Sequence, residues 1–137
     1  MTLIDLNVLL DVLQKREPHL RASARVLDYL LRGPDKGAFS AHAITTIHYV
    51  IGKYNDNKTA NQAVDWLFRN FHIVAVGRSE LLRARALGWD DFEDAVVVAA
   101  AETAKCSAIV TRNVKDFADS PVPPFTPEEF LATRKDA

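Results

Sequence analysis

The chain is poor in the residue types on which several large classes of protein depend. Its single cysteine, Cys106, cannot form an internal disulfide; this fits a reducing compartment, and we expect a buried structural thiol. The 5 glycines form no phosphate-binding loop, and neither a nucleophile elbow nor a redox cysteine pair occurs. The 4 histidines are scattered, which excludes the closely spaced ligands of a zinc site.

Long apolar runs and an excess of either charge are also missing. No apolar run reaches membrane-spanning length, and Asp5, Asn7 and Asp11 interrupt the N-terminal stretch where a signal peptide would be apolar. Lys and Arg total 17 against 18 Asp and Glu, so the formal net charge of -1 gives no overall basic field to hold nucleic acid. We therefore expect a cytoplasmic protein that makes no membrane contact and binds any nucleic acid locally or through a metal ion.

What the sequence does contain is an alternation of strand and helix patterns. The 137 residues, 48% hydrophobic and 26% charged, fit a single domain over residues 1–137. Short apolar runs predict buried strands, at residues 2–4, 38–40, 72–76 and 108–111. The prolines that follow leave room for a short edge strand near Phe125, and helical periodicity fills the other intervals. This order predicts an α/β fold with a mainly parallel sheet.

Residues 95–101 are apolar throughout and fit a helix better than a strand. Three consecutive valines favour a strand, but four alanines, the acids before the run, and Glu102 with Lys105 after it favour a helix. We expect this helix to be buried against the sheet. A last helix is expected after Thr126, where Pro127 and Glu129 complete the pattern of a capped helix start.

Acidic residues stand at three junctions between the expected elements. Asp5 ends the first strand, Asp91 and Asp94 precede the apolar helix, and Asp116 follows the fourth strand. Parallel strands gather their carboxyl ends at one edge of a sheet, so these acids can meet there. Carboxylates that lie close together repel one another unless a cation neutralises them, and an all-oxygen ligand set favours Mg²⁺ or Mn²⁺. Such an ion can bind a phosphate oxygen and acidify a water, as phosphodiester hydrolysis requires.

Each acid also has a structural alternative. Asp5, Asp91 or Asp94 could cap the helix that follows it, and Asp116 could cap a short turn. Asp91 and Asp94 are three residues apart. If both are helical, this spacing places them on one face of the helix, but the same spacing is expected of an N-cap residue followed by an acid in the first turn. Spacing alone does not separate these two interpretations.

Three segments together resemble the PIN-domain family of nucleases. They are Ile4-Asp5-Leu6-Asn7-Val8-Leu9, Phe92-Glu93-Asp94-Ala95 and Val110-Thr111-Arg112-Asn113-Val114-Lys115-Asp116-Phe117. The resemblance covers nearly the whole chain and implies a three-layer α/β/α sandwich with a Mg²⁺- or Mn²⁺-dependent ribonuclease site made by acids. It also implies frequent membership of toxin-antitoxin pairs as a VapC-like toxin, with RNA as substrate, a small antitoxin protein as partner, and a homodimer.

The resemblance also implies roles for particular residues. Asp5 matches the first acid of the metal site and Asp94 the third, while Asp116 or the position of Asn113 matches the fourth. Asp91 is a further candidate ligand. Two supporting residues, Asn7 and Thr111, would orient carboxylates, and a third, Arg112, would contact a phosphate.

The second acid of the family pattern is absent from this chain. Family members usually carry a Glu in the helix after the second strand, in a Thr-x-x-Glu pattern, and Thr45-Thr46-Ile47-His48 places His48 at that position. A neutral imidazole can ligate a metal or move a proton but removes one negative charge, and His42 is a second candidate to compensate. The alternative for His48 is an ordinary hydrogen-bonded helix residue.

Two hypotheses about function follow. The first is a metal-dependent endoribonuclease, the toxin of a type II toxin-antitoxin pair, in which Asp5, Asp94 and Asp116 hold the metal. The second is a catalytically impaired PIN-fold module that binds RNA or a protein partner, because His48 and Asn113 stand where acids are expected. A receiver-like signalling domain fits less well, since the chain lacks an acid pair before the first strand.

Overall fold

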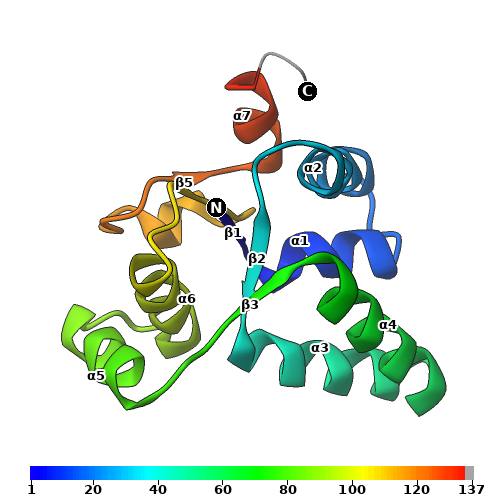
Figure 1. The fold of residues 1–137 in the computed structure, drawn as a ribbon, viewed down its shortest axis with the longest axis horizontal. Helices are drawn as coiled ribbons and strands as arrows, with labels where there is room; N and C mark the ends of the chain where they lie inside the picture. The colour runs from blue at the N-terminus through cyan, green and yellow to red at the C-terminus, as the bar shows by residue number, and fades with distance from the viewer. Residues whose placement is uncertain (135–137) are drawn as a thin grey trace.

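A parallel five-stranded sheet forms the centre of the protein in the computed structural model, which describes residues 1–134 (Figure 1). The strands are β1 (Thr2–Ile4), β2 (Gly37–Ser40), β3 (His72–Val74), β4 (Ala108–Val110) and β5 (Pro124–Phe125). They lie in the order β3-β2-β1-β4-β5, and every neighbouring pair is parallel. β1 therefore lies in the middle of the sheet, with later strands on both sides.

Helices cover both faces of the sheet and confirm the predicted three-layer arrangement. Within residues 1–134 they are α1 (Leu6–Leu13), α2 (Leu20–Arg32), α3 (Ala41–Tyr54), α4 (Asn57–Asn70), α5 (Arg78–Leu87), α6 (Phe92–Thr103), the 3-10 helix η1 (Val114–Phe117) and α7 (Pro127–Ala132). Figure 1 shows α1 to α4 on one side of the sheet and α5 with α6 on the other. In this described part of the chain, no helix is both long and apolar enough to cross a membrane.

Alternating side chains of the strands separate the core into two parts. Ile4, Phe39 and Val110 point to the side of α1 to α4, where they join a large apolar cluster. Phe39 is fully buried there and meets the ring of Phe71 edge to face, with the ring centroids 5.2 Å apart. This cluster fixes the position of α1, the helix that begins directly after β1.

The second part of the core lies between the sheet and α6. Val97 and Val98 of α6 pack against strand residues such as Ile109, whereas Val96 and Ala99 pack against Ala84 of α5. A helix that is covered on both sides must be apolar all round. The predicted helix over residues 95–101 is thus confirmed as part of α6, and its packing explains why the run shows no amphipathic pattern.

Two of the predicted strands extend too far. β3 ends at Val74, which pairs with Ser40, the last residue of β2. The prediction to residue 76 is wrong because β2 gives way to α3 after Ser40, so the chain beyond Val74 has no strand beside it. β4 ends at Val110, opposite Ile4 of β1, for the same reason. The predictions of a buried Cys106 and of a short strand at Phe125 are confirmed.

Phe39→Ala should destabilise the protein by about 3–5 kcal/mol, since it removes a fully buried ring and leaves a cavity beside Phe71. The matched control is Phe68→Ala on α4, because the Phe68 side chain is 59% exposed and its loss should cost about 0.5 kcal/mol or less. Urea denaturation of both variants gives the two free energies of unfolding. Equal losses would contradict the assignment of Phe39 to the core.

Candidate functional site at the carboxyl edge of the sheet

The site begins where β1 and β4 end side by side. From β1 the chain continues through β2 to β3 in one direction of the sheet, while β4 and β5 lie on the other side. Such a point of reversal leaves a crevice at the carboxyl ends of the two central strands. The first residues after these strands are Asp5 and Thr111, and the backbone N–H of Asp5 donates to the carbonyl of Val110 at 2.9 Å.

Asp5 is buried and held by the other strand end. It is 3% exposed, and the Thr111 hydroxyl donates to its Oδ2 at 2.8 Å. The backbone N–H of Asn113 in turn donates to the Thr111 hydroxyl oxygen at 3.1 Å, which directs the hydroxyl hydrogen toward Asp5. Asp5 occupies the N-cap position of α1, but its side chain makes no capping hydrogen bond of full geometry, although the backbone N–H groups of Leu6 and Asn7 lie close enough to lower its pKa. Capping alone therefore does not explain this carboxylate.

The electrostatic environment makes Asp5 costly to ionise. Burial raises its pKa above the ordinary value, and the negative charge of Glu93 adds to the increase. The Thr111 hydroxyl and the backbone N–H groups of Leu6 and Asn7 act in the opposite direction. A carboxylate placed in this way gains from any nearby positive charge.

Asp94 shares this environment from the first turn of α6. Its pKa is raised to about 7, first by burial and then by the negative charges of Asp5, Asp91 and Asp116. Each of these charges must lie close enough to Asp94 to repel its ionised form. Asp94 therefore lies within electrostatic range of Asp5, Asp91 and Asp116, and we call these four residues the acidic cluster.

Asp91 and Asp116 lie on the outer side of the acidic cluster. The Asp91 side chain accepts a hydrogen bond from the backbone N–H of Asp94 at 3.0 Å, so it serves as the N-cap of α6. Asp116 is exposed in η1. Both line a hollow of about 390 Å³ between the start of α6 and η1, together with Trp89 and Lys115.

The donor set of the acidic cluster fits a hard divalent cation. Within residues 1–134, no three His, Cys, Asp or Glu side chains converge closely enough to hold a metal ion by themselves. Mg²⁺ is commonly held by one or two carboxylates and keeps several waters, so two acids such as Asp5 and Asp94 meet its requirements. Their mutual repulsion is relieved by a positive charge, which is the physical reason for the fit.

The two candidate histidines on α3 point to different neighbours. His48 Nε2 forms a 2.8 Å hydrogen bond with Oδ1 of Asn61 on α4, as an ordinary helix histidine would. His42 lies near the backbone of Glu93 at the start of α6, and burial lowers its pKa. Both ring nitrogens of His42 are buried without a hydrogen-bond partner in the described part of the chain. Of the two, His42 is the one beside the acidic cluster, and a site role for His48 stays a prediction.

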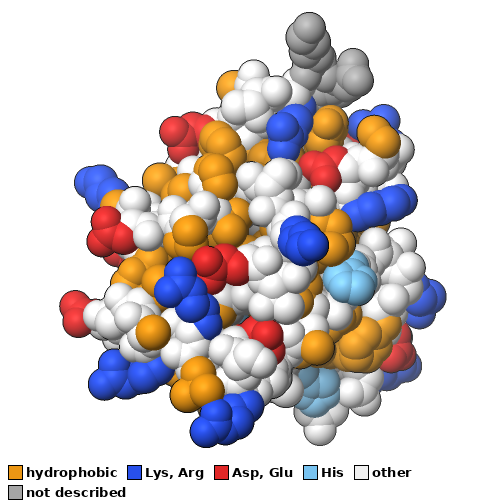
Figure 2. All heavy atoms as spheres, turned by 60° about the vertical axis from the view of Figure 1, so that its left-hand side comes forward, with side chains coloured by type: hydrophobic (Ala, Val, Ile, Leu, Met, Phe, Trp, Pro, Cys, Tyr) orange, Lys and Arg blue, Asp and Glu red, His pale blue; other side chains and the backbone are white. Residues whose placement is uncertain are grey.

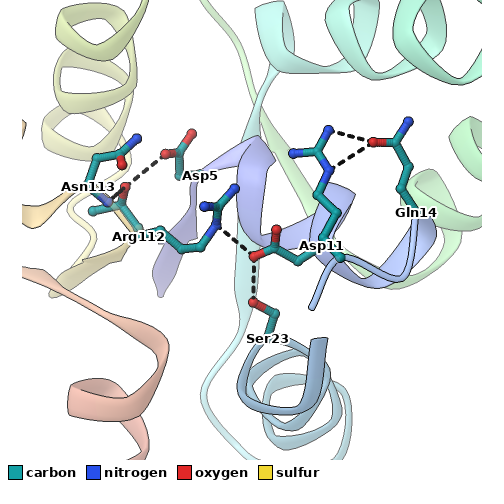
Figure 3. Close-up of polar contacts among 8 residues, drawn as sticks. Asp5, Asp11, Gln14, Ser23, Arg112 and Asn113 are labelled. Carbon is teal, nitrogen blue, oxygen red and sulfur yellow. Dashed lines mark hydrogen bonds and ion pairs between the residues drawn. The ribbon is translucent and has the colours of Figure 1, made fainter. Parts of the chain in front are cut away.

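Arg112 already has a carboxylate partner. Its Nε lies 2.8 Å from Oδ2 of Asp11 on α1, which also accepts a hydrogen bond from Ser23 of α2 at 3.0 Å (Figure 3). The phosphate contact suggested for Arg112 stays a prediction. Sequence reasoning missed Asp11, although an acid that follows the buried residues Leu9 and Leu10 directly is a signal for a paired charge inside the fold.

Charges of both signs surround the outer side of the site. Figure 2 shows the face on the side of α5 and α6, with acidic side chains near its middle and Lys and Arg side chains on several sides of them. Arg83 on α5 forms an ion pair with Glu102 of α6 at 2.9 Å and so contributes to the packing of α5 on α6. On the face that Figure 2 shows, the charges do not form a continuous basic surface.

A parallel α/β/α sandwich with acids at the carboxyl edge of its central strands defines the class of protein. A model of the PIN domain family matches residues 1–115, and the chain belongs to that family. Ribonuclease VapC1 of Aquifex aeolicus (strain VF5) is 27% identical over 132 residues, which span 93% of this chain and 90% of that protein.

Solved structures share the fold. A toxin-antitoxin complex from Klebsiella pneumoniae contains a chain with 25% identity and a TM-score of 0.72, over 93% of this chain and 98% of that one. VapBC2 from Rickettsia felis, bound to a DNA fragment from its promoter, has 16% identity and a TM-score of 0.71, over 91% and 97% of the two chains. At this identity, the second likeness shows the fold alone.

The raised pKa of Asp94 gives the metal-free protein a pH dependence of definite sign. The folded state binds the proton with a pKa of about 7, against an ordinary value of 3.8. The stabilisation is fully present below the lower value and is lost as the pH rises through the higher one. Asp94→Asn should therefore stabilise the protein relative to wild type at about pH 8, and much less at about pH 4.

Urea denaturation in the presence of EDTA measures this difference between Asp94→Asn and wild type. Asp28→Asn is the matched control, since Asp28 is exposed on α2 and pairs only with Arg32 among the contacts described. A difference for Asp94→Asn that does not change with pH would contradict the raised pKa.

Proposed function

We propose that the protein is a Mg²⁺- or Mn²⁺-dependent endoribonuclease and the toxin component of a type II toxin-antitoxin pair. The observation that carries the proposal is the pair of carboxylates Asp5 and Asp94, which are crowded together at the carboxyl edge of the sheet and both have raised pKa values. Membership of the PIN domain family and the likeness to a VapC ribonuclease support it.

Each residue of the acidic cluster has a role in this proposal. Asp5 and Asp94 hold the cation, and Asp116 approaches it from η1 as a third, outer acid. Thr111 fixes the Asp5 carboxylate through its hydroxyl, and Asn113 fixes Thr111. Asp91 holds the start of α6 in place as its N-cap and adds negative charge to the cluster. Asn7 contributes its backbone N–H near Asp5.

A bound divalent cation would supply Lewis-acid activation of the phosphate and of the attacking water. The residues of the chain provide the surroundings for this chemistry. Burial of Asp5 excludes water from its carboxylate. The hollow between α6 and η1 gives a strand of RNA access to the outer acids Asp91 and Asp116, which line it. Lys115 lines the same hollow, beside Asp90 and Asp119 as well, and provides its positive charge for the phosphate backbone.

An antitoxin protein and a second copy of the chain are the proposed protein partners. The likeness to a chain in the toxin-antitoxin complex from Klebsiella pneumoniae, which covers 93% of this chain, supports the antitoxin. The second copy follows only from the resemblance to the family. If the proposal holds, the product of a short reading frame next to the gene should copurify with the chain and suppress its RNA cleavage. Size-exclusion chromatography with light scattering measures the oligomeric state of the free chain.

Asp5→Asn should abolish RNA cleavage that depends on Mg²⁺ or Mn²⁺, because the amide cannot replace the charge of the innermost carboxylate. Cleavage is followed on a labelled RNA with and without EDTA. Asp28→Asn removes an exposed carboxylate in the same way and should cleave like wild type. Full activity of Asp5→Asn, or wild-type cleavage that is insensitive to EDTA, would refute the proposal.

The alternative of a catalytically impaired module is favoured by two observations. His48 is hydrogen-bonded to Asn61, and in the described residues no three potential ligands converge. The two functions differ in the effect of Mn²⁺ on thermal stability. A binding site for the ion should raise the melting temperature of wild type but not of Asp5→Asn, since a ligand that binds only the folded state stabilises it. A melting temperature unchanged by Mn²⁺, with no cleavage, would favour the impaired module.

A further inference from the structure

An ion pair with a fully buried carboxylate and a partly exposed guanidinium lies outside the acidic cluster and joins three segments of the chain. Asp11 on α1 is 0% exposed, and its Oδ2 contacts both Arg112 Nε at 2.8 Å and the hydroxyl of Ser23 on α2 at 3.0 Å. The other oxygen, Oδ1, is buried and has no hydrogen-bond partner within residues 1–134. The Asp11 carboxylate therefore depends on the guanidinium for compensation of its charge.

The position of Arg112 in the sequence links this pair to the site. Arg112 lies between Thr111, whose hydroxyl donates to Asp5 at 2.8 Å, and Asn113, whose N–H donates to that hydroxyl at 3.1 Å. The loop that holds the Asp5 carboxylate therefore also carries the Arg112 guanidinium. Figure 3 shows the Arg112 side chain between Asp5 on one side and Asp11 on the other, with its contact made to Asp11.

Stability alone does not explain why this contact is made by two charged side chains. Replacing a buried ion pair by apolar side chains is often neutral or stabilising, so a neutral contact could hold the loop equally well. A guanidinium is also a strong partner for any carboxylate. If Arg112 were released from Asp11, its long side chain could turn to the nearby Asp5 carboxylate. The guanidinium would then occupy the place of a metal ion.

We infer that Asp11 is a positioning residue for the acidic cluster: it retains the Arg112 guanidinium and so keeps the Asp5 carboxylate available to a divalent cation. This inference rests on the proposed function, because it assumes that the cluster binds Mg²⁺ or Mn²⁺. Asp11 acts through Arg112 and touches neither the ion nor the RNA. Its effect is on the affinity for the metal.

The two single variants that break the pair distinguish this role from a merely structural one. Asp11→Asn leaves a free guanidinium beside the site, whereas Arg112→Gln leaves none. Asp11→Asn should weaken Mn²⁺ binding by about tenfold or more, the usual effect of a residue that supports a metal ligand. Arg112→Gln should bind Mn²⁺ nearly as wild type does, although it breaks the same contact.

The double variant Asp11→Asn/Arg112→Gln should regain the Mn²⁺ affinity that Asp11→Asn loses. Isothermal titration of the full chain with Mn²⁺ gives the affinities, and thermal melts show that each variant is folded. Ser23→Ala is the matched control inside the network, since it removes one hydrogen bond to Asp11 and leaves the ion pair; its Mn²⁺ affinity should not change.

Equal weakening in both single variants would overturn the inference, as would wild-type affinity in Asp11→Asn or no recovery in the double variant. If Asp11→Asn does not fold, Arg112→Gln still decides, because weak Mn²⁺ binding in that folded variant contradicts the role of Asp11. Failure of the proposed function gives a different result: wild type itself then neither binds Mn²⁺ nor cleaves RNA.

Discussion

The parallel pairing of β1 with β4 is the interaction on which the rest of the site depends. It places Asp5 beside Thr111, residues 106 positions apart in the sequence, and lets the backbone of Asp5 bond to Val110. The helix α6, which precedes β4 and packs on the sheet, then brings Asp94 to the same edge. No local feature of the chain could assemble these carboxylates without that pairing.

The acidic cluster lowers the stability of the folded protein in exchange for a site that favours a cation. Burial and repulsion raise the pKa of Asp94 to about 7, so ionising the cluster near neutral pH costs free energy. The start of α6 offsets part of this cost, because the N-terminus of a helix favours negative charge. A bound cation would offset more. Such a conflict between local stability and chemistry is typical of sites that bind ions or substrates.

Sequence reasoning could predict those parts of the structure that local patterns determine. The apolar run of α6, the strand before Asp5 and the capping box at Thr126 all follow from neighbouring residues. The strand ends were less predictable, since the end of β3 is set by its neighbour β2. The direction of His48 toward α4 depends on how α3 is rotated against the rest of the fold, which a motif of four residues does not determine. The pair of Asp11 with Arg112 was missed because its partners meet only through the tertiary fold.

The place of β1 in the sheet also bears on the synthesis of the chain. Of the five strands, β1 leaves the ribosome first, and on one side it can pair with β2 soon afterwards. Its other side can pair only after β4 (Ala108–Val110) has been made, so one edge of the central strand stays unpaired while the intervening residues are synthesised. Asp5 is made well before Thr111 and Asp116. The acidic cluster is therefore completed only after β4 and η1 have been synthesised, and a chain cut short before β4 has the first acid of the site without the surroundings that position it.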